Sequence, residues 1–184
     1  MEPFFLGVIF IWLALVSWFD LRKREVSHSA WMIIPLICAG VYQTVAGDWR
    51  LSFLTAIVAL ASERQRLAKL TELHVDTIFF WIPWLLVGLY VAASHDPVGA
   101  IAIVAFWAAW ELRCWGGADA VTAITLALIW PDMRLVIAVL IVHAFVAVIA
   151  SLDSLIRERK LRVHQFPGLP LLMLSAVLRL ISSL

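Results

Sequence analysis

Charged residues are scarce in this chain. They make up 15% of its 184 residues, whereas apolar residues make up 64%, and the mean hydropathy is +0.97. Soluble domains carry about 25% charged and roughly 45–50% apolar residues. A chain this short has too much surface to hide such an apolar excess in one water-covered core. The composition therefore excludes a soluble enzyme and a disordered chain, and it predicts an all-α integral membrane protein.

Several chemical signatures are missing as well. The two cysteines, Cys38 and Cys114, form neither a disulfide framework nor a metal-binding spacing, and we expect both to be small buried side chains. No His-Glu-x-x-His or Gly-x-Ser-x-Gly motif occurs, so the sequence predicts no metal, no cofactor and no serine nucleophile. A net charge of +1 gives nucleic-acid binding no electrostatic support.

The first apolar run begins at Phe4 with no Lys or Arg before it and no small-residue cleavage site after it. We therefore expect a retained helix rather than a cleavable signal peptide. Polar stretches reach about a dozen residues at most, which leaves no room for an extramembrane domain. One transmembrane domain over residues 1–184 is the prediction.

Breaks at charged residues, glycine and proline divide the chain into apolar runs. The runs cover residues 4–19, 30–46, 51–62, 77–94, 98–112, 120–130, 135–151 and 169–184. A membrane-spanning helix needs about 20 residues, and Arg and Lys side chains lengthen shorter runs by reaching the membrane surface. The pattern predicts a polytopic helix bundle of about eight transmembrane helices, with six or seven as the alternative because run 51–62 is weak.

The placement of basic residues predicts the topology. If the N-terminus is outside and all eight runs span, the outside turns carry only Arg50 and Arg134. The inside loops then carry Arg22, Lys23, Arg24, Arg64, Arg66, Lys69, Arg113, Arg157, Arg159, Lys160 and Arg162. Lys and Arg concentrate on the cytoplasmic side of membrane proteins. We therefore expect a multi-pass protein of the cytoplasmic membrane with its N-terminus outside. Without run 51–62 as a span, every later loop would change sides, so the charge distribution favours counting this run as a span.

Two aspartates lie at predicted helix ends on the cytoplasmic side. Asp20 follows the first run, and Asp119 precedes the sixth, directly after Gly116, Gly117 and Ala118. If the two carboxylates meet, one keeps a proton at neutral pH, and the pair activates water and protonates a carbonyl, as in aspartic proteases. The glycines would allow a tight turn and the close approach of a substrate strand. The structural alternative is a solvated Asp20 and an Asp119 that caps its helix.

The segments around these aspartates resemble the type IV prepilin leader peptidases, a family of GxGD-type intramembrane aspartyl proteases. In that family the first aspartate lies in D-x-R-x-R-x-[IV]-P-N, and residues 20–28 here read DLRKREVSH. The second aspartate lies in G-x-G-D, and residues 116–119 here read GGAD. Ser27 and His28 therefore replace the usual Pro-Asn, and Ala118 replaces the second glycine. Residues 166–170, which read FPGLP, are similar to the family's proline-containing entry to the last helix.

The resemblance implies an aspartic endopeptidase of the form that lacks the N-terminal methylation domain. Asp20 and Asp119 would be the catalytic residues, and Gly116, Gly117 and Ala118 would support the active-site loop. The implied partners are pilin-like precursors of the type IV pilus class. Intramembrane proteolysis would remove their short basic leader at the cytoplasmic face of the bilayer.

Two other classes of protein stay open. One is a catalytically inactive peptidase-like scaffold, and the other is a small ion-coupled transporter that uses Asp20, Asp119 and His143. The remaining polar residues favour structural roles. Glu111 and Arg113 are expected to form a pair that reaches the membrane surface, with orientation of the Asp119 loop as the alternative.

Overall fold

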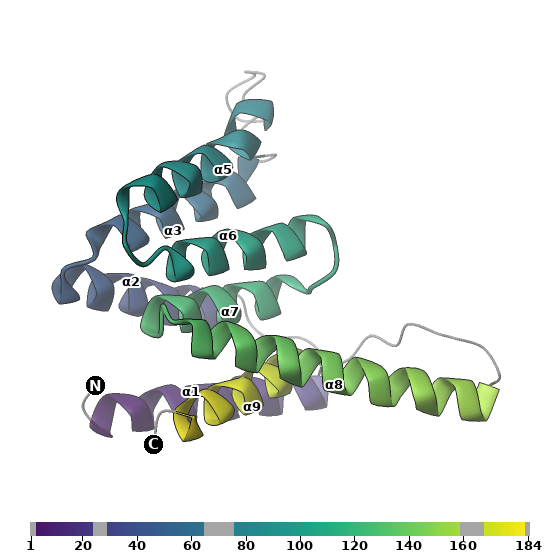
Figure 1. Ribbon diagram of the computed structural model, residues 1–184. Helices are drawn as coiled ribbons and strands as arrows, with labels where there is room; N and C mark the ends of the chain where they lie inside the picture. Colours follow the sequence, from purple (N-terminus) through teal and green to yellow (C-terminus); the bar gives the residue numbers. More distant parts are fainter. Residues whose placement is uncertain (1–2, 24–28, 65–75, 159–167, 183–184) are drawn as a thin grey trace. The chain divides into compact units, whose positions relative to one another are not determined.

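The computed structural model describes residues 3–23, 29–64, 76–158 and 168–182, and this part of the chain consists of helices and turns without a β-strand (Figure 1). The all-α prediction is therefore confirmed. The chain forms two compact units, Met1–Trp31 with Arg134–Leu184, and Met32–Met133.

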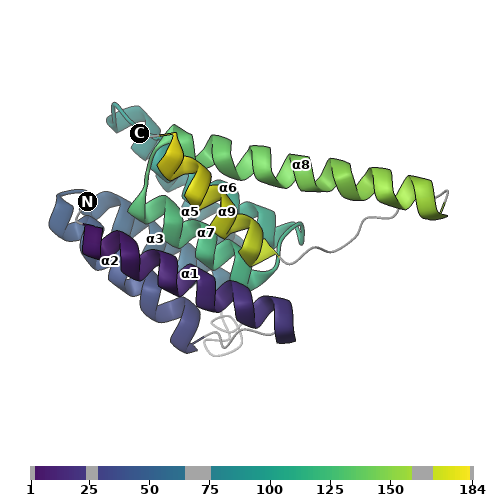
Figure 2. The same ribbon diagram turned by 90° about the horizontal axis from the view of Figure 1, so that it is seen from below.

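The first unit is built from α1, α8 and α9. Their bounds are Pro3–Lys23, Met133–Glu158 and Gly168–Ile181. The helices α1 and α9 pack against each other, as the purple and yellow ribbons of Figure 2 show. The Trp12 Nε1 group donates a 2.9 Å hydrogen bond to the carbonyl oxygen of Trp31, the last residue of this unit's N-terminal part.

The second unit contains five α-helices among the described residues. A π-helical turn, Ser29–Ile33, leads into α2, and the helices are α2 (Ile34–Ala46), α3 (Trp49–Ser62), α5 (Asp76–Ala93), α6 (Val98–Glu111) and α7 (Gly117–Ile129). Helix α2 packs on α3 and α7, α3 packs on α5 and α6, and α6 packs on α5 and α7. Gly47 ends α2 with φ of 103°, a left-handed conformation that favours glycine.

Within the described residues each of the eight apolar runs coincides with a helix, so the helix positions were predicted correctly. The number of spans is not confirmed. By length and composition, two of the described helical stretches are suited to crossing a membrane: Phe4–Arg22 and Met133–Leu152. The helices α3, α6 and α9 have 14 residues each. At about 1.5 Å per residue, such a helix is shorter than the hydrocarbon core of about 30 Å.

The two ends of the second unit differ in composition. At one end, Tyr90 in the last turn of α5 bonds to Asp48 in the turn between α2 and α3. At the same end, Gly99 of α6 touches Pro131, which follows α7. At the other end, Arg64 after α3 pairs with Glu111 of α6. The turns that contain Asp48 and Pro131, both predicted outside, thus lie at one end of this unit, and the pair of Arg64 with Glu111 lies at the other.

Large apolar side chains form exposed stripes on two helices of the second unit. On α5 the stripe is Ile78, Trp81, Leu85 and Leu89, and on α2 it is Ile34, Ile37, Val41 and Val45. Their spacing of three and four residues places each set on one helix face. Cys38 and Cys114 are also exposed. The prediction of two buried cysteines was wrong, because α2 turns its Cys38 side chain outward and Cys114 lies in a loop.

Candidate active site

Asp119 lies in the first turn of α7, three residues after the N-cap residue Gly116. Its side chain is half-buried. The first four backbone N–H groups of a helix have no partner within the helix, and the macrodipole favours a negative charge there. Asp119 is thus a half-buried carboxylate in the first turn of a helix.

Gly116 leaves room for this carboxylate. A Cβ atom added to Gly116 would lie 3.1 Å from Asp119 Oδ2 and 3.8 Å from Asp119 Cγ, which shows that the side chain folds back over the glycine. The conformation of Gly116, with φ of −70° and ψ of 154°, is open to any residue. The backbone at Gly116 therefore does not use the left-handed region that favours glycine. What Gly116 provides is the absence of a side chain beside Asp119.

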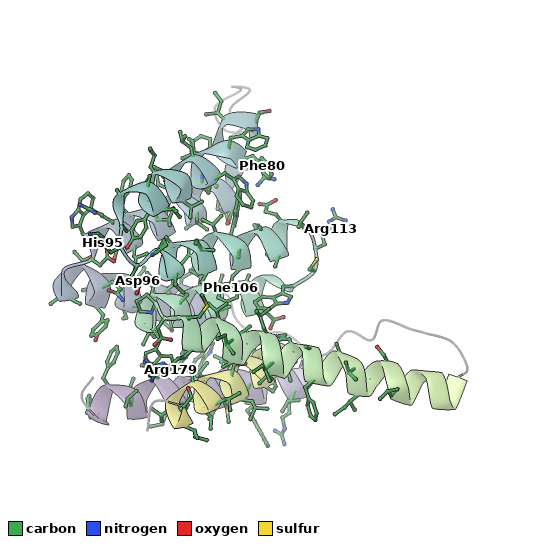
Figure 3. All side chains as sticks on the ribbon, viewed as in Figure 1. Phe80, His95, Asp96, Phe106, Arg113 and Arg179 are labelled. Atoms are coloured by element: carbon green, nitrogen blue, oxygen red, sulfur yellow. The ribbon has the colours of Figure 1, made fainter. Side chains whose placement is uncertain are left out.

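The loop before α7 is fastened to the end of α6. The N–H groups of Cys114 and Trp115 both donate to the carbonyl oxygen of Ala109, over 2.8 and 3.2 Å. The Trp115 ring stacks on Phe106 with centroids 5.4 Å apart and an interplanar angle of 14°. Arg113, with φ of 58°, is the left-handed residue of this loop, and Figure 3 shows its side chain pointing away from the helices.

Helix α6 also touches the first residue of α7. A Cβ atom at Gly117 would lie 3.5 Å from the indole nitrogen of Trp110 and 3.9 Å from Trp110 Cδ1. These are ordinary van der Waals distances, so the space beside Gly117 accepts a methyl group. Ala118, the third residue of the predicted supporting loop, is half-buried. The structure brings Gly116, Gly117, Ala118 and Asp119 into one helix start beside Trp110.

Asp20 belongs to the first unit, one turn before the end of α1, and is half-buried. Its neighbour Phe19 packs on Trp31 with ring centroids 5.4 Å apart. On the exposed face of the same turn, the guanidinium carbon of Arg22 lies 4.9 Å from the ring centroid of Trp18. The rest of the first motif, including Ser27 and His28, lies outside the described residues.

The two aspartates belong to different units, and their pairing remains a prediction. Within the described residues, no group of three or more His, Cys, Asp or Glu side chains is placed to hold a metal ion. His143 Nδ1 lies 2.8 Å from the carbonyl oxygen of Val139, one turn earlier in α8.

The sequence pattern did not predict the ion pair between Arg64 and Glu111. Glu111 accepts a bidentate pair of hydrogen bonds from the guanidinium group of Arg64, with Arg64 Nη2 2.8 Å from Glu111 Oε2. Arg113 had been the expected partner. Residues two positions apart do not face each other at a helix end, and nothing in the sequence separates Arg64 from the other inside-loop cations as a partner for Glu111.

Comparisons with protein-family models, with curated proteins and with solved structures found no match to this chain. The resemblance to prepilin leader peptidases therefore rests on the residues around Asp20 and Asp119 and on residues 166–170.

Proposed function

We propose that this protein is a membrane-embedded aspartyl endopeptidase that removes the short basic leader from pilin-like precursors at the cytoplasmic membrane face. The observation that carries the proposal is the setting of Asp119. Its half-buried carboxylate lies over a residue without a side chain, at the charged end of its unit. A water-activating carboxylate needs such an accessible and fixed position.

The positions of the two aspartates along their helices suit opposite roles. Asp119 lies in the first turn of α7, where the macrodipole favours an ionised carboxylate. Asp20 lies in the last described turn of α1, away from the N-terminus of its helix. We assign Asp119 the role of the base that activates water and Asp20 the role of the acid that protonates the scissile carbonyl. Two carboxylates in different environments divide acid and base catalysis in this way.

The exposed apolar surface of α2 and α5 favours contact with a lipid bilayer. The stripes on α2 and α5 are long, apolar and uninterrupted by charge. Exposed apolar patches of this extent are rare on soluble monomers. We propose that all eight apolar helices lie in the membrane, and that the short helices reach its surfaces through their polar ends.

The substrate class follows from the resemblance and fits this orientation. A precursor with a basic leader and a long apolar helix would place the helix in the bilayer and the leader at the cytoplasmic face. Asp119 lies at the same end of its unit as Arg64 and Glu111 and at the other end from Asp48. Cleavage at the leader boundary would thus occur where the charged end of the protein meets the membrane surface.

The test is cleavage of a co-expressed pilin-like precursor, followed as a gel shift after leader removal. Asp20→Asn and Asp119→Asn are nearly isosteric changes that remove a proton-accepting oxygen, so each should abolish cleavage at matched expression. Because the two carboxylates act as a unit, the double variant should be no worse than either single variant. His143→Ala, in which the mid-helix ring is removed, serves as the control and should retain cleavage. Full cleavage by either aspartate variant would overturn the mechanism. A wild-type protein that cleaves none of several precursors from its own genome would favour the inactive scaffold.

A further inference from the structure

The charged end of the second unit contains an ion pair that lies beside an aromatic ring. Arg64, just after α3, binds Glu111 in the last turn of α6 through both guanidinium nitrogens. The two side chains retain only 14% and 15% of their accessible surface. The guanidinium carbon of Arg64 also lies 5.4 Å from the ring centroid of Phe80, which Figure 3 labels on α5. Three helices therefore meet at one cation.

The pair is costly to bury, so its position needs a reason. Desolvation removes much of the Coulombic gain of a buried ion pair, and apolar residues of similar volume often stabilise such a site equally well. A planar, bidentate Arg–carboxylate contact does fix the orientation of both partners. Here the carboxylate partner belongs to the last turn of α6, the helix from which the Asp119 loop departs.

The contacts continue from Glu111 to Asp119. The residue before Glu111 is Trp110, whose indole edge packs against Gly117 at the start of α7. Adjacent helical residues point about 100° apart, so fixing Glu111 toward Arg64 also fixes the direction of Trp110. The loop that follows is hydrogen-bonded to Ala109 in the same turn. The rotation of the last turn of α6 thus sets the position of the first turn of α7.

We propose that Arg64 and Glu111 are positioning residues for the Asp119 carboxylate. The ion pair locks the end of α6, and Trp110 and the loop residues carry this constraint to Gly116 and Asp119. We assign neither charge a contact with the substrate or the reacting atoms. This inference rests on the proposed peptidase function for its effect on cleavage, but the constraint on the loop itself is independent of catalysis.

The kinetic test uses purified full-length protein with a pilin-like precursor. Arg64→Gln should lower kcat about tenfold or more, because a misplacement of about 1 Å in a catalytic group has effects up to 10²-fold, and it should leave KM unchanged. Arg64→Lys keeps the charge but loses the bidentate geometry. Its kcat should therefore lie between the kcat of the wild type and that of Arg64→Gln. Arg50→Gln removes a cation from the exposed first turn of α3, at the other end of the unit, and should leave kcat unchanged. An Arg64→Lys protein with wild-type kcat would overturn the proposal.

A second readout does not depend on cleavage. Ala118→Cys, in a background with Cys38→Ser and Cys114→Ser, reports the exposure of the Asp119 loop through its rate of labelling by a neutral maleimide. Arg64→Gln and Arg64→Lys should each raise this rate severalfold, whereas labelling of Asp96→Cys, at the other end of α6 in Figure 3, should not change. An unchanged rate at Ala118 in both variants would overturn the positioning role. A wild type that cleaves nothing would count against the peptidase function alone.

Discussion

Tyr90 donates a 2.8 Å hydrogen bond from its phenol to Asp48 Oδ2, and the two residues are 42 positions apart in the sequence. The bond joins the last turn of α5 to the turn between α2 and α3. It lies at one end of the second unit, and the Arg64–Glu111 pair lies at the other. Each end of the second unit therefore has a polar contact between residues far apart in the sequence, 42 positions at one end and 47 at the other.

Loss of the Tyr90 hydroxyl should destabilise the protein. Tyr90→Phe leaves the Asp48 carboxylate without this donor, and hydrogen bonds to charged groups contribute about 1.5–3 kcal/mol. Chemical unfolding in detergent micelles should show a loss near the lower limit, because the site is only part-buried. Asp48→Asn retains an acceptor oxygen and should cost less. Equal stability of Tyr90→Phe and wild type would show that the bond contributes nothing.

Two glycine substitutions should change stability in opposite directions. A Cβ atom at Gly99 would lie 2.5 Å from Pro131 Cβ and 3.2 Å from Pro131 Cα, so Gly99→Ala forces the two chain segments apart. Overpacking of this kind costs about 1–3 kcal/mol. Gly88, inside α5, has nothing within 4 Å of its added Cβ, and Gly88→Ala should stabilise the helix by about 0.5–1 kcal/mol. Thermal unfolding of both variants checks the contrast, and a stabilised Gly99→Ala would contradict the close contact.

The two glycines before Asp119 should differ in activity. The added methyl group of Gly116→Ala meets Asp119 Oδ2, a flexible side-chain end, so the carboxylate moves and the fold does not. We expect a fall in cleavage of about tenfold or more with an unchanged unfolding temperature. Gly117→Ala meets Trp110 at an ordinary contact distance and should retain most activity. The same precursor gel shift measures both. Equal activity of the two variants would show that the carboxylate position over Gly116 is irrelevant.

The predicted topology has its own test in labelling from the two sides of the membrane. With Cys38 and Cys114 replaced by serine, single cysteines at Lys23 and Arg113 should react only when the reagent has access to the cytoplasm. Cysteines at Trp49 and Asp132 should react from outside, because the turns without a basic excess face away from the cytoplasm. Opposite accessibility of the loops at Asp20 and Asp119 would end the dyad hypothesis, since the two carboxylates could not share one water.

The sequence by itself determined the fold class and the positions of the helices. Apolar runs separated by charged residues, glycine and proline predicted the helices, and within the described residues each run coincides with a helix. The sequence also placed a helix directly after the Gly-Gly-Ala-Asp segment, with Asp119 as its opening or capping residue, but α7 begins two residues earlier, at Gly117, and its N-cap residue is Gly116. Local chemistry fixes such features, so a single sequence shows them.

Only the tertiary structure decided which polar groups meet. Gln43 of α2 donates its side-chain amide to the carbonyl oxygen of Leu128, 85 residues away, and so satisfies a carbonyl in the last turn of α7. Arg64 rather than Arg113 binds Glu111 over a separation of 47 residues. Gly116 makes room for Asp119 through the absence of its Cβ atom. Each relationship depends on how helices rotate and pack, and the direction of a side chain around a helix has no meaning until a neighbouring helix supplies the partner.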